Sequence, residues 1–299
     1  AWKRGELGYD VTPAVFTSED QLSDLVYNGF CGANMSKYTV KLSHGEGKTA
    51  VFLKPCDTYS FNQLLCEHRI IRDNVYVVGI PCDGMLDEGK MKHLVPELLG
   101  AEEGGETVHL KTYDDVLTTP RTELLLERCE NCKSRRHVVY DELLGEDGEV
   151  LDSHRFDEVE RLEAMTPDER YAFWQGELSR CIRCNACRNV CPACTCEKCV
   201  FDNPESGVEN KAAANSFEEK LFHVIRAFHV AGRCTDCGEC SRVCPQNIPL
   251  HLLNRKFISD INRLYGDYQA GETDNGRSPL VNFNKGDGEP CDFDKGGRE

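Results

Sequence analysis

The sequence predicts two domains of different class, an α/β domain with a parallel βαβ unit and then an α-helical domain. Two strand-like segments, residues 50–53 and 75–80, flank a helical pattern and predict the βαβ unit. Two cysteine runs, at residues 181–192 and 234–245, mark the second domain, and a helical pattern lies between them. The chain contains 18 cysteines, and these runs hold eight of them.

Composition restricts the class of protein. A chain of 299 residues with 40% hydrophobic residues can form about two globular domains. We expect no transmembrane helix, because no apolar stretch approaches the ~20 residues that cross a bilayer. No basic, apolar leader follows Ala1, so we expect thiols used as ligands in an oxygen-poor cytoplasm rather than disulfides.

The net charge of −16 argues against a nucleic-acid partner, since acidic surfaces repel the phosphate backbone. The same charge can serve solubility, or it can steer the protein towards a basic partner.

The first thirty residues predict one helix. Residues up to Thr17 show no period and are expected along a surface. A helix is then expected from Ser18 to about Gly29, with Leu22 and Leu25 on one face. Cys31 follows in a glycine-flanked turn, where a free thiol is favoured over a neighbour of a metal cluster.

The βαβ unit places two cysteines at equivalent positions. Its crossover of some twenty residues makes the two strands parallel. Cys56 follows the first strand and Cys82 the second, each within a Pro-Cys-Asp tripeptide. Because ligands of open α/β sheets bind beyond the carboxyl ends of the strands, both thiols are expected at one crevice.

Residues 108–126 predict further strands and lead to Cys129 and Cys132, spaced as Cys-x-x-Cys. With Cys56 and Cys82 they make four thiolates, the number that a 4Fe-4S cluster or a structural zinc ion needs. Iron is favoured, because the C-terminal half already has two cluster-type runs. The alternative is a redox dithiol at Cys129 and Cys132 with two buried cysteines elsewhere. Cys66 is most simply a core residue.

Residues 147–165 are acidic and predict a link between the domains. Thr166 and Glu169 form a capping box with Pro167 at the first helical position, which predicts a helix through Trp174 and Leu178. This helix leads directly into the first cysteine run.

Each run has the spacing Cys-x-x-Cys-x-x-Cys-x-x-x-Cys-Pro, which resembles that of bacterial ferredoxins. In that pattern three thiolates bind one 4Fe-4S cluster and the fourth binds the neighbouring cluster. The first predicted cluster therefore has Cys181, Cys184, Cys187 and Cys244 as ligands. The second has Cys234, Cys237, Cys240 and Cys191.

Other cysteines and arginines near the runs each have two possible roles. Cys194, Cys196 and Cys199 lie outside the template and form either part of an extra site, with Cys31 or Cys66, or free thiols. Five arginines close to the ligands can offset the charge of the clusters or serve as ordinary surface charge: Arg180, Arg183, Arg188, Arg233 and Arg242.

A polar loop over residues 202–215 and a capping box at Ser216 predict a helix between the two runs. His223 and His229 on this helix are expected to be structural. A last amphipathic helix is expected near Leu264, and residues 266–299, with a free thiol at Cys291, are expected to be an extended or disordered tail. The predicted domains are residues 1–146 and 166–265.

Several motifs resemble the β-subunit family of deazaflavin-reducing hydrogenases and formate dehydrogenases: Lys-Pro-Cys-Asp at 54–57, Gly-Ile-Pro-Cys-Asp-Gly-Met at 79–85, the Cys-x-x-Cys at 129–132 and residues 139–146. The inserted helix resembles the α-helical dicluster ferredoxin domains of heterodisulfide reductases. This resemblance implies a cluster on Cys56, Cys82, Cys129 and Cys132, and it also implies FAD. The chain has no G-x-G-x-x-G fingerprint, so no residue is assigned to a flavin.

The predicted function is therefore an electron-transfer subunit with three 4Fe-4S clusters in a multisubunit anaerobic redox complex. The spacing of its residues suggests no catalytic triad or paired carboxylates, and no catalytic residue is predicted. The alternatives are a flavin-dependent oxidoreductase that reduces a deazaflavin or nicotinamide, and a scaffold that uses clusters only for folding.

Overall fold

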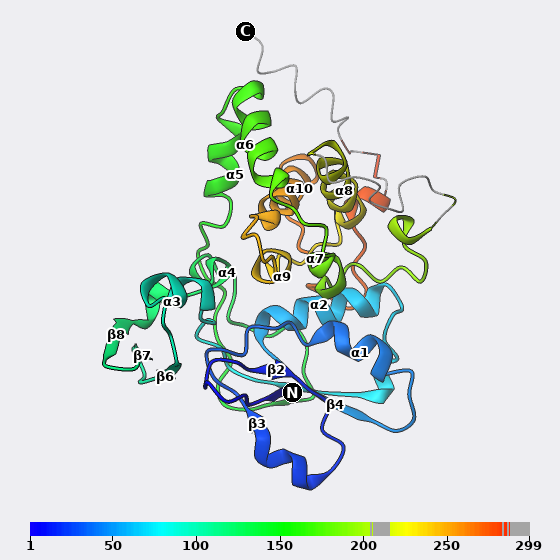
Figure 1. Ribbon diagram of the computed structural model, residues 1–299. Coiled ribbons are helices and arrows are strands. Elements are labelled where there is room, and N and C mark those ends of the chain that lie inside the picture. Colours follow the sequence, from blue (N-terminus) through cyan, green and yellow to red (C-terminus); the bar gives the residue numbers. More distant parts are fainter. Residues whose placement is uncertain (204, 206–215, 283, 286, 288–299) are drawn as a thin grey trace. The chain divides into compact units, whose positions relative to one another are not determined.

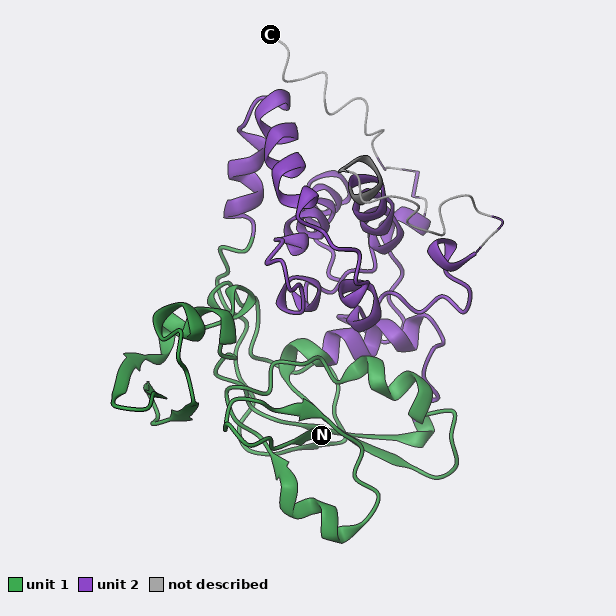
Figure 2. Ribbon diagram, in the orientation of Figure 1, with its two compact units in different colours: residues 1–57, 73–155 green, residues 58–72, 156–299 purple. Residues whose placement is uncertain are grey.

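The computed structural model describes residues 1–203, 205, 216–282, 284–285 and 287, without the side chains of 216–219. Cys291 and most of the predicted loop 202–215 lie outside the described residues. The chain divides into two compact units (Figure 2). Unit 1 comprises residues 1–57 and 73–155, and unit 2 comprises residues 58–72 and 156–299.

A parallel sheet forms the centre of unit 1. Its strand order is β4 (Thr49–Leu53), β5 (Val75–Gly79) and β9 (Glu142–Leu143). β4 and β5 are parallel, which confirms the predicted βαβ unit, whereas β9 was not predicted. Leu53 and Val77 have no exposed surface, as expected for strands covered on both faces. Helix α1 (Ser36–Leu42) packs against β4 (Figure 1).

The crossover helix α2 (Pro55–Cys66) begins two residues after β4, and its residues from Thr58 onward belong to unit 2. The register pairs Leu53 with Gly79. Cys56 and Cys82 each lie three residues beyond this pair, so the two thiols occupy equivalent places past the carboxyl ends of β4 and β5.

The predicted helix from Ser18 to Gly29 is wrong. Only a 3₁₀ helix, Glu19–Asp24, is present, and β3 (Leu25–Val26) follows it. β3 and β2 (Thr12–Pro13) pair antiparallel with β1 (Trp2–Lys3). Leu22 is 52% exposed, so the apolar face of the expected helix has no core to cover, and strand pairing takes over. Trp2 is buried rather than lying along the surface.

A second sheet of unit 1 is antiparallel and comprises β6 (Gly100–Glu103), β7 (Thr107–Lys111) and β8 (Val116–Pro120). This confirms that residues 108–126 supply further strands. Met91 of α3 (Glu88–Leu94) packs in the same core as Val108 and Leu110. The short helix α4 (Glu127–Glu130) follows and contains Cys129.

Unit 2 is helical. Its elements include α5 (Asp157–Glu163), α6 (Pro167–Ser179), α7 (Ala186–Val190), α8 (Ser216–Val230), α9 (Glu239–Arg242) and α10 (Leu250–Tyr265), with 3₁₀ helices at Val200–Asp202 and Pro279–Val281. The capping box of Thr166 and Glu169 is present, which confirms the predicted start of α6. α5 is a helix within the segment 147–165 that was predicted as a link.

The core of unit 2 surrounds cysteines. Cys187 and Cys240 are buried in one cluster with Leu178, Phe222 and Ile248. α8 contacts both α6 and α10, and α7 contacts α9 (Figure 1). The thiols of the two runs are therefore surrounded by apolar side chains. Among the described residues, no helix has the length and apolar character that crossing a bilayer requires.

Candidate metal centres

The two cysteine runs share one backbone geometry. In each run the third and fifth residues have positive φ: Arg183 (55°) and Asn185 (62°) in the first, Asp236 (58°) and Gly238 (66°) in the second. The fifth residue then precedes a short helix, α7 or α9. Residues with positive φ at alternate positions curl the backbone tightly, so the repeated geometry indicates a loop that directs three thiols inwards.

All four cysteines predicted for the first cluster line one pocket in unit 2. They are Cys181, Cys184 and Cys187 from the first run and Cys244 from the end of the second. Burial raises the pKa of the Cys187 thiol to about 11, and the charges of Cys181, Cys244 and Cys184 also raise it. The fourth cysteine of the second run thus lies with the first three of the other run.

The second set is linked in the same crossed manner. Burial raises the pKa of Cys234 well above its ordinary value, and Cys237 and Cys191 are among the charges that add to this rise. Burial likewise raises the pKa of Cys240 to about 11, with Cys191 again a contributing neighbour. Cys191, the last cysteine of the first run, is therefore an electrostatic neighbour of Cys234 and Cys240 in the second run.

Helix α8 carries two polar side chains into this apolar core. His223 is 2% exposed, and its Nε2 lies 3.3 Å from the Sγ of Cys181. Burial and the nearby Arg226 and Arg183 lower the pKa of His223 to about 3, so the imidazole is neutral at pH 7. The backbone N–H of Arg183 also donates to Cys181 Sγ, at 3.3 Å.

Arg226 lies three residues after His223 and is 3% exposed. Its Nη2 donates to the backbone oxygen of Cys187 at 3.0 Å. Burial disfavours its charge, yet neighbouring thiols outweigh burial and raise the pKa of Arg226: Cys191, Cys240, Cys187 and Cys194. The guanidinium is thus a permanent positive charge close to cysteines of both sets.

The arginines selected from the sequence have other contacts. Arg180, Arg188, Arg233 and Arg242 form ion pairs with Glu177, Asp202, Glu67 and Glu239, respectively. Arg183 lies over the ring of Phe222, 3.9 Å from its centroid. The charge of four of the five is therefore largely offset by a carboxylate.

Unit 1 brings its four predicted cysteines into electrostatic reach of one another. Burial raises the pKa of Cys82 to about 11, and Cys129 and Cys132 are among the charges that add to this rise. Cys82 in turn raises the pKa of Cys56, which burial already places well above its ordinary value. Met85 donates its backbone N–H to Cys129 Sγ at 3.3 Å.

A buried cation stands beside these thiols. Lys54 is fully buried, and its Nζ lies 2.9 Å from Asp57 Oδ2 and 2.8 Å from the backbone oxygen of Ala33. The ring of Trp2 is 4.4 Å away. Burial alone would lower the pKa of Lys54, but Asp57 and Cys56 outweigh it and raise the pKa.

The remaining cysteines have contacts of their own. Cys31 lies near Asn28, and Cys66 donates to the backbone oxygen of Thr273 at 3.3 Å. Cys66 is half-buried, so it is not a full core residue. Within the described ranges, no three His, Cys, Asp or Glu side chains converge on a point that could hold a single metal ion. A 4Fe-4S cluster does not need such convergence, because each thiolate binds a separate iron.

The donor chemistry of both units fits four-iron clusters. Each of the three sets offers four thiols in buried or half-buried places, except for the exposed Cys184. A permanent or ion-paired cation stands close to each set, as the negative charge of thiolate ligands requires. These clusters would be held by the residues named above.

Comparison with known proteins agrees with this geometry. Residues 177–248 match the family described as "4Fe-4S dicluster domain". An 82-residue stretch is 36% identical to ferredoxin-3 of Sinorhizobium fredii, covering 26% of this chain and 76% of that protein. This chain belongs to the dicluster iron–sulfur proteins.

The similarity of this iron–sulfur chain to other proteins extends well beyond the dicluster domain. It is 25% identical to the F420-dependent formate dehydrogenase subunit beta of Methanocaldococcus jannaschii, over 95% of this chain and 89% of that one. The corresponding subunit beta of formate dehydrogenase 1 from Methanococcus maripaludis is 23% identical, over 67% and 68% of the two chains. The family resemblance inferred from the sequence motifs is confirmed.

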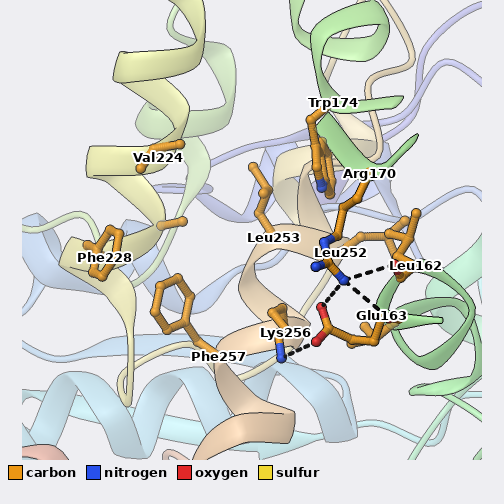
Figure 3. Close-up of a pocket in the computed structure, with 12 residues that line it drawn as sticks. Leu162, Glu163, Arg170, Trp174, Val224, Phe228, Leu252, Leu253, Lys256 and Phe257 are labelled. Carbon is orange, nitrogen blue, oxygen red and sulfur yellow. Dashed lines mark hydrogen bonds and ion pairs between the residues drawn. The ribbon is translucent and has the colours of Figure 1, made fainter. Parts of the chain in front are cut away.

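A cavity of about 210 Å³ lies among α5, α6, α8 and α10 in unit 2 of the iron–sulfur chain (Figure 3). Leu252, Leu253 and Phe228 line it, while the cations on its wall, Arg170 and Lys256, both contact Glu163. Cofactor sites commonly measure about 300–1,000 Å³, so this cavity does not fit FAD.

Sequence reasoning missed His223 and Arg226 as residues that contact the candidate cluster ligands. Both lie on α8, about 40 residues from the cysteines that they touch. A signal was present, because two polar residues three apart interrupt a helix whose face carries Phe222 and Ile225. Buried polar residues on an apolar face indicate a specific partner.

Proposed function

We propose that this chain relays single electrons through three 4Fe-4S clusters within a multisubunit redox complex. The observation that carries the proposal is the pocket lined by Cys181, Cys184, Cys187 and Cys244. Three of these residues come from one ferredoxin-type run and the fourth from the other, as dicluster ferredoxins require. Such crossed ligation holds two clusters close together, which suits transfer between them.

The protein's own residues would set the properties of these carriers. When bound, 4Fe-4S clusters supply one-electron oxidation and reduction, with potentials that depend on charge, solvent exposure and hydrogen bonds to sulfur. Leu178, Phe222 and Ile248 exclude water from the side of Cys187. The backbone N–H of Arg183 donates to Cys181 Sγ, and His223 Nε2 would donate to the same sulfur when its ring proton is on Nε2. These contacts favour the reduced state, because they stabilise negative charge on sulfur.

The third cluster is proposed for Cys56, Cys82, Cys129 and Cys132 of unit 1. Its support is the equivalent position of Cys56 and Cys82 past paired strands, together with the mutual influence of the thiols on one another. With this site the chain has carriers in both units, and it serves as a relay rather than as a reaction centre.

The complex is proposed to be a formate dehydrogenase, a hydrogenase or a heterodisulfide-reductase-like assembly. Both related methanogen proteins are named as formate dehydrogenase beta subunits, which favours the first of these. The electrons would pass between a catalytic subunit and a flavin- or cluster-bearing partner.

Anaerobic reduction of the purified chain tests this function. We expect a low-potential donor to produce electron paramagnetic resonance signals of reduced 4Fe-4S clusters, and re-oxidation to remove them. Signals that do not change on reduction would contradict the relay and favour a structural scaffold. Stoichiometric release of a yellow flavin on denaturation would instead favour the flavin-dependent oxidoreductase.

A further inference from the structure

Arg226 is a buried cation of unit 2 to which the proposed relay gives no role. It is 3% exposed, and its Nε has no hydrogen-bond partner within the part of the chain that the structure describes. None of the ion pairs found among the described residues includes it, whereas Arg255, also buried in unit 2, pairs with Asp236 at 2.8 Å. A buried guanidinium without a carboxylate is costly unless another anion stands near it.

The thiols that act on Arg226 belong to both candidate clusters, apart from Cys194, and those of the clusters become anionic when they bind iron. Cys191 and Cys240 belong to the second set and Cys187 to the first, and all three act on the guanidinium. The hydrogen bond to Cys187 oxygen holds the side chain at one end. A cluster with four thiolates carries net negative charge, which supplies the missing counter-charge once the clusters are bound.

We propose that Arg226 is a positioning residue that raises the reduction potentials of the two dicluster-domain clusters. The inference rests on the proposed function, since it requires bound clusters. A fixed positive charge stabilises the reduced cluster, which carries one more negative charge than the oxidised cluster. Low polarity around the site makes this interaction strong, because few waters screen it.

The arrangement also explains why helix α8 lies between the two runs. Four of the five arginines close to the two cysteine runs in sequence form ion pairs with carboxylates, as Arg180 does with Glu177. α8 instead delivers Arg226 and His223 from one face of a helix, three residues apart, towards different cysteines. The two clusters can thereby differ in potential, and a difference in potential gives electron flow a direction.

The test is a redox titration of the full, anaerobically purified chain followed by electron paramagnetic resonance. In R226Q we expect unchanged iron content and lower potentials of the dicluster-domain clusters. At a fixed solution potential, the ratio of reduced to oxidised cluster should fall about tenfold for at least one of them. Tenfold corresponds to about 59 mV for a one-electron couple. R226K keeps the charge and should shift the ratio much less.

The matched control is R180Q. Arg180 adjoins Cys181 in sequence, but it is exposed and paired with Glu177, so its loss should leave the ratio within about twofold. Full iron with unshifted potentials in R226Q would overturn the inference.

Loss of iron has separate consequences. If R226Q loses iron and R226K retains it, the positive charge is needed to hold the clusters rather than to set their potentials, and the inference as stated fails. If both variants lose iron, the charge is not the property that matters, and the inference fails. A wild-type chain without dicluster iron would instead overturn the proposed function.

Discussion

Replacing Cys191 with serine is expected to damage the cluster held mainly by the second cysteine run. Cys191 lies among the neighbours of Cys234 and Cys240, although it follows Cys187 by only four residues. C191S and C234S should therefore lose or alter the same electron paramagnetic resonance signal, with a loss of up to about four iron atoms. C181S and C244S should alter the other signal.

C196S is the control for these cysteine variants. C196S removes an exposed thiol outside the ferredoxin template and should leave the iron content and both signals unchanged. If C191S instead matched C181S, each run would bind its own cluster, and the crossed ligation would be wrong.

Replacing Lys54 with methionine is expected to destabilise unit 1 by about 3–5 kcal/mol. Lys54 and Asp57 are 0% and 1% exposed, and their charged atoms lie 2.9 Å apart. K54M leaves the carboxylate of Asp57 buried without its cation. The loss can be measured by denaturant unfolding in a W174F background, so that fluorescence reports Trp2, which contacts Lys54.

Two further variants separate buried charge from lost packing. Adding D57N to K54M should recover much of the loss, because the uncompensated charge is removed. K92M breaks the exposed pair of Lys92 with Glu88 and should change the unfolding free energy by about 0.5 kcal/mol or less. A K54M chain within about 1 kcal/mol of wild type would contradict the account of this pair.

The sequence predicted best where a local pattern determines the structure. The βαβ unit follows from two apolar segments and a crossover length, and the capping box of Thr166 starts α6 as expected. The ferredoxin-type spacing also placed Cys244 with the first run, and Cys244 lines one pocket with Cys181, Cys184 and Cys187; the crossed ligation itself stays a prediction. In these cases the interacting residues are close in sequence or share a known template.

Long-range contacts were harder to predict. Leu25 and Val26 have helical spacing with Leu22, but they pair with Lys3 and Trp2, respectively, and form a strand. Residues 58–72 lie inside the βαβ unit, yet they group with unit 2, where Glu67 pairs with Arg233, three residues past the end of α8. Arg226 and His223 carried no motif, because their partners are about 40 residues away. The hydrophobic periodicity of a single segment does not indicate which distant residues that segment contacts.

The most direct test of the three-cluster relay is a count of iron, acid-labile sulfide and zinc in the anaerobically purified full chain. The account predicts about twelve iron and about twelve sulfide per chain, four of each per cluster, and no stoichiometric zinc. About eight iron with one zinc would contradict the cluster of unit 1. About four iron or fewer would contradict the relay itself.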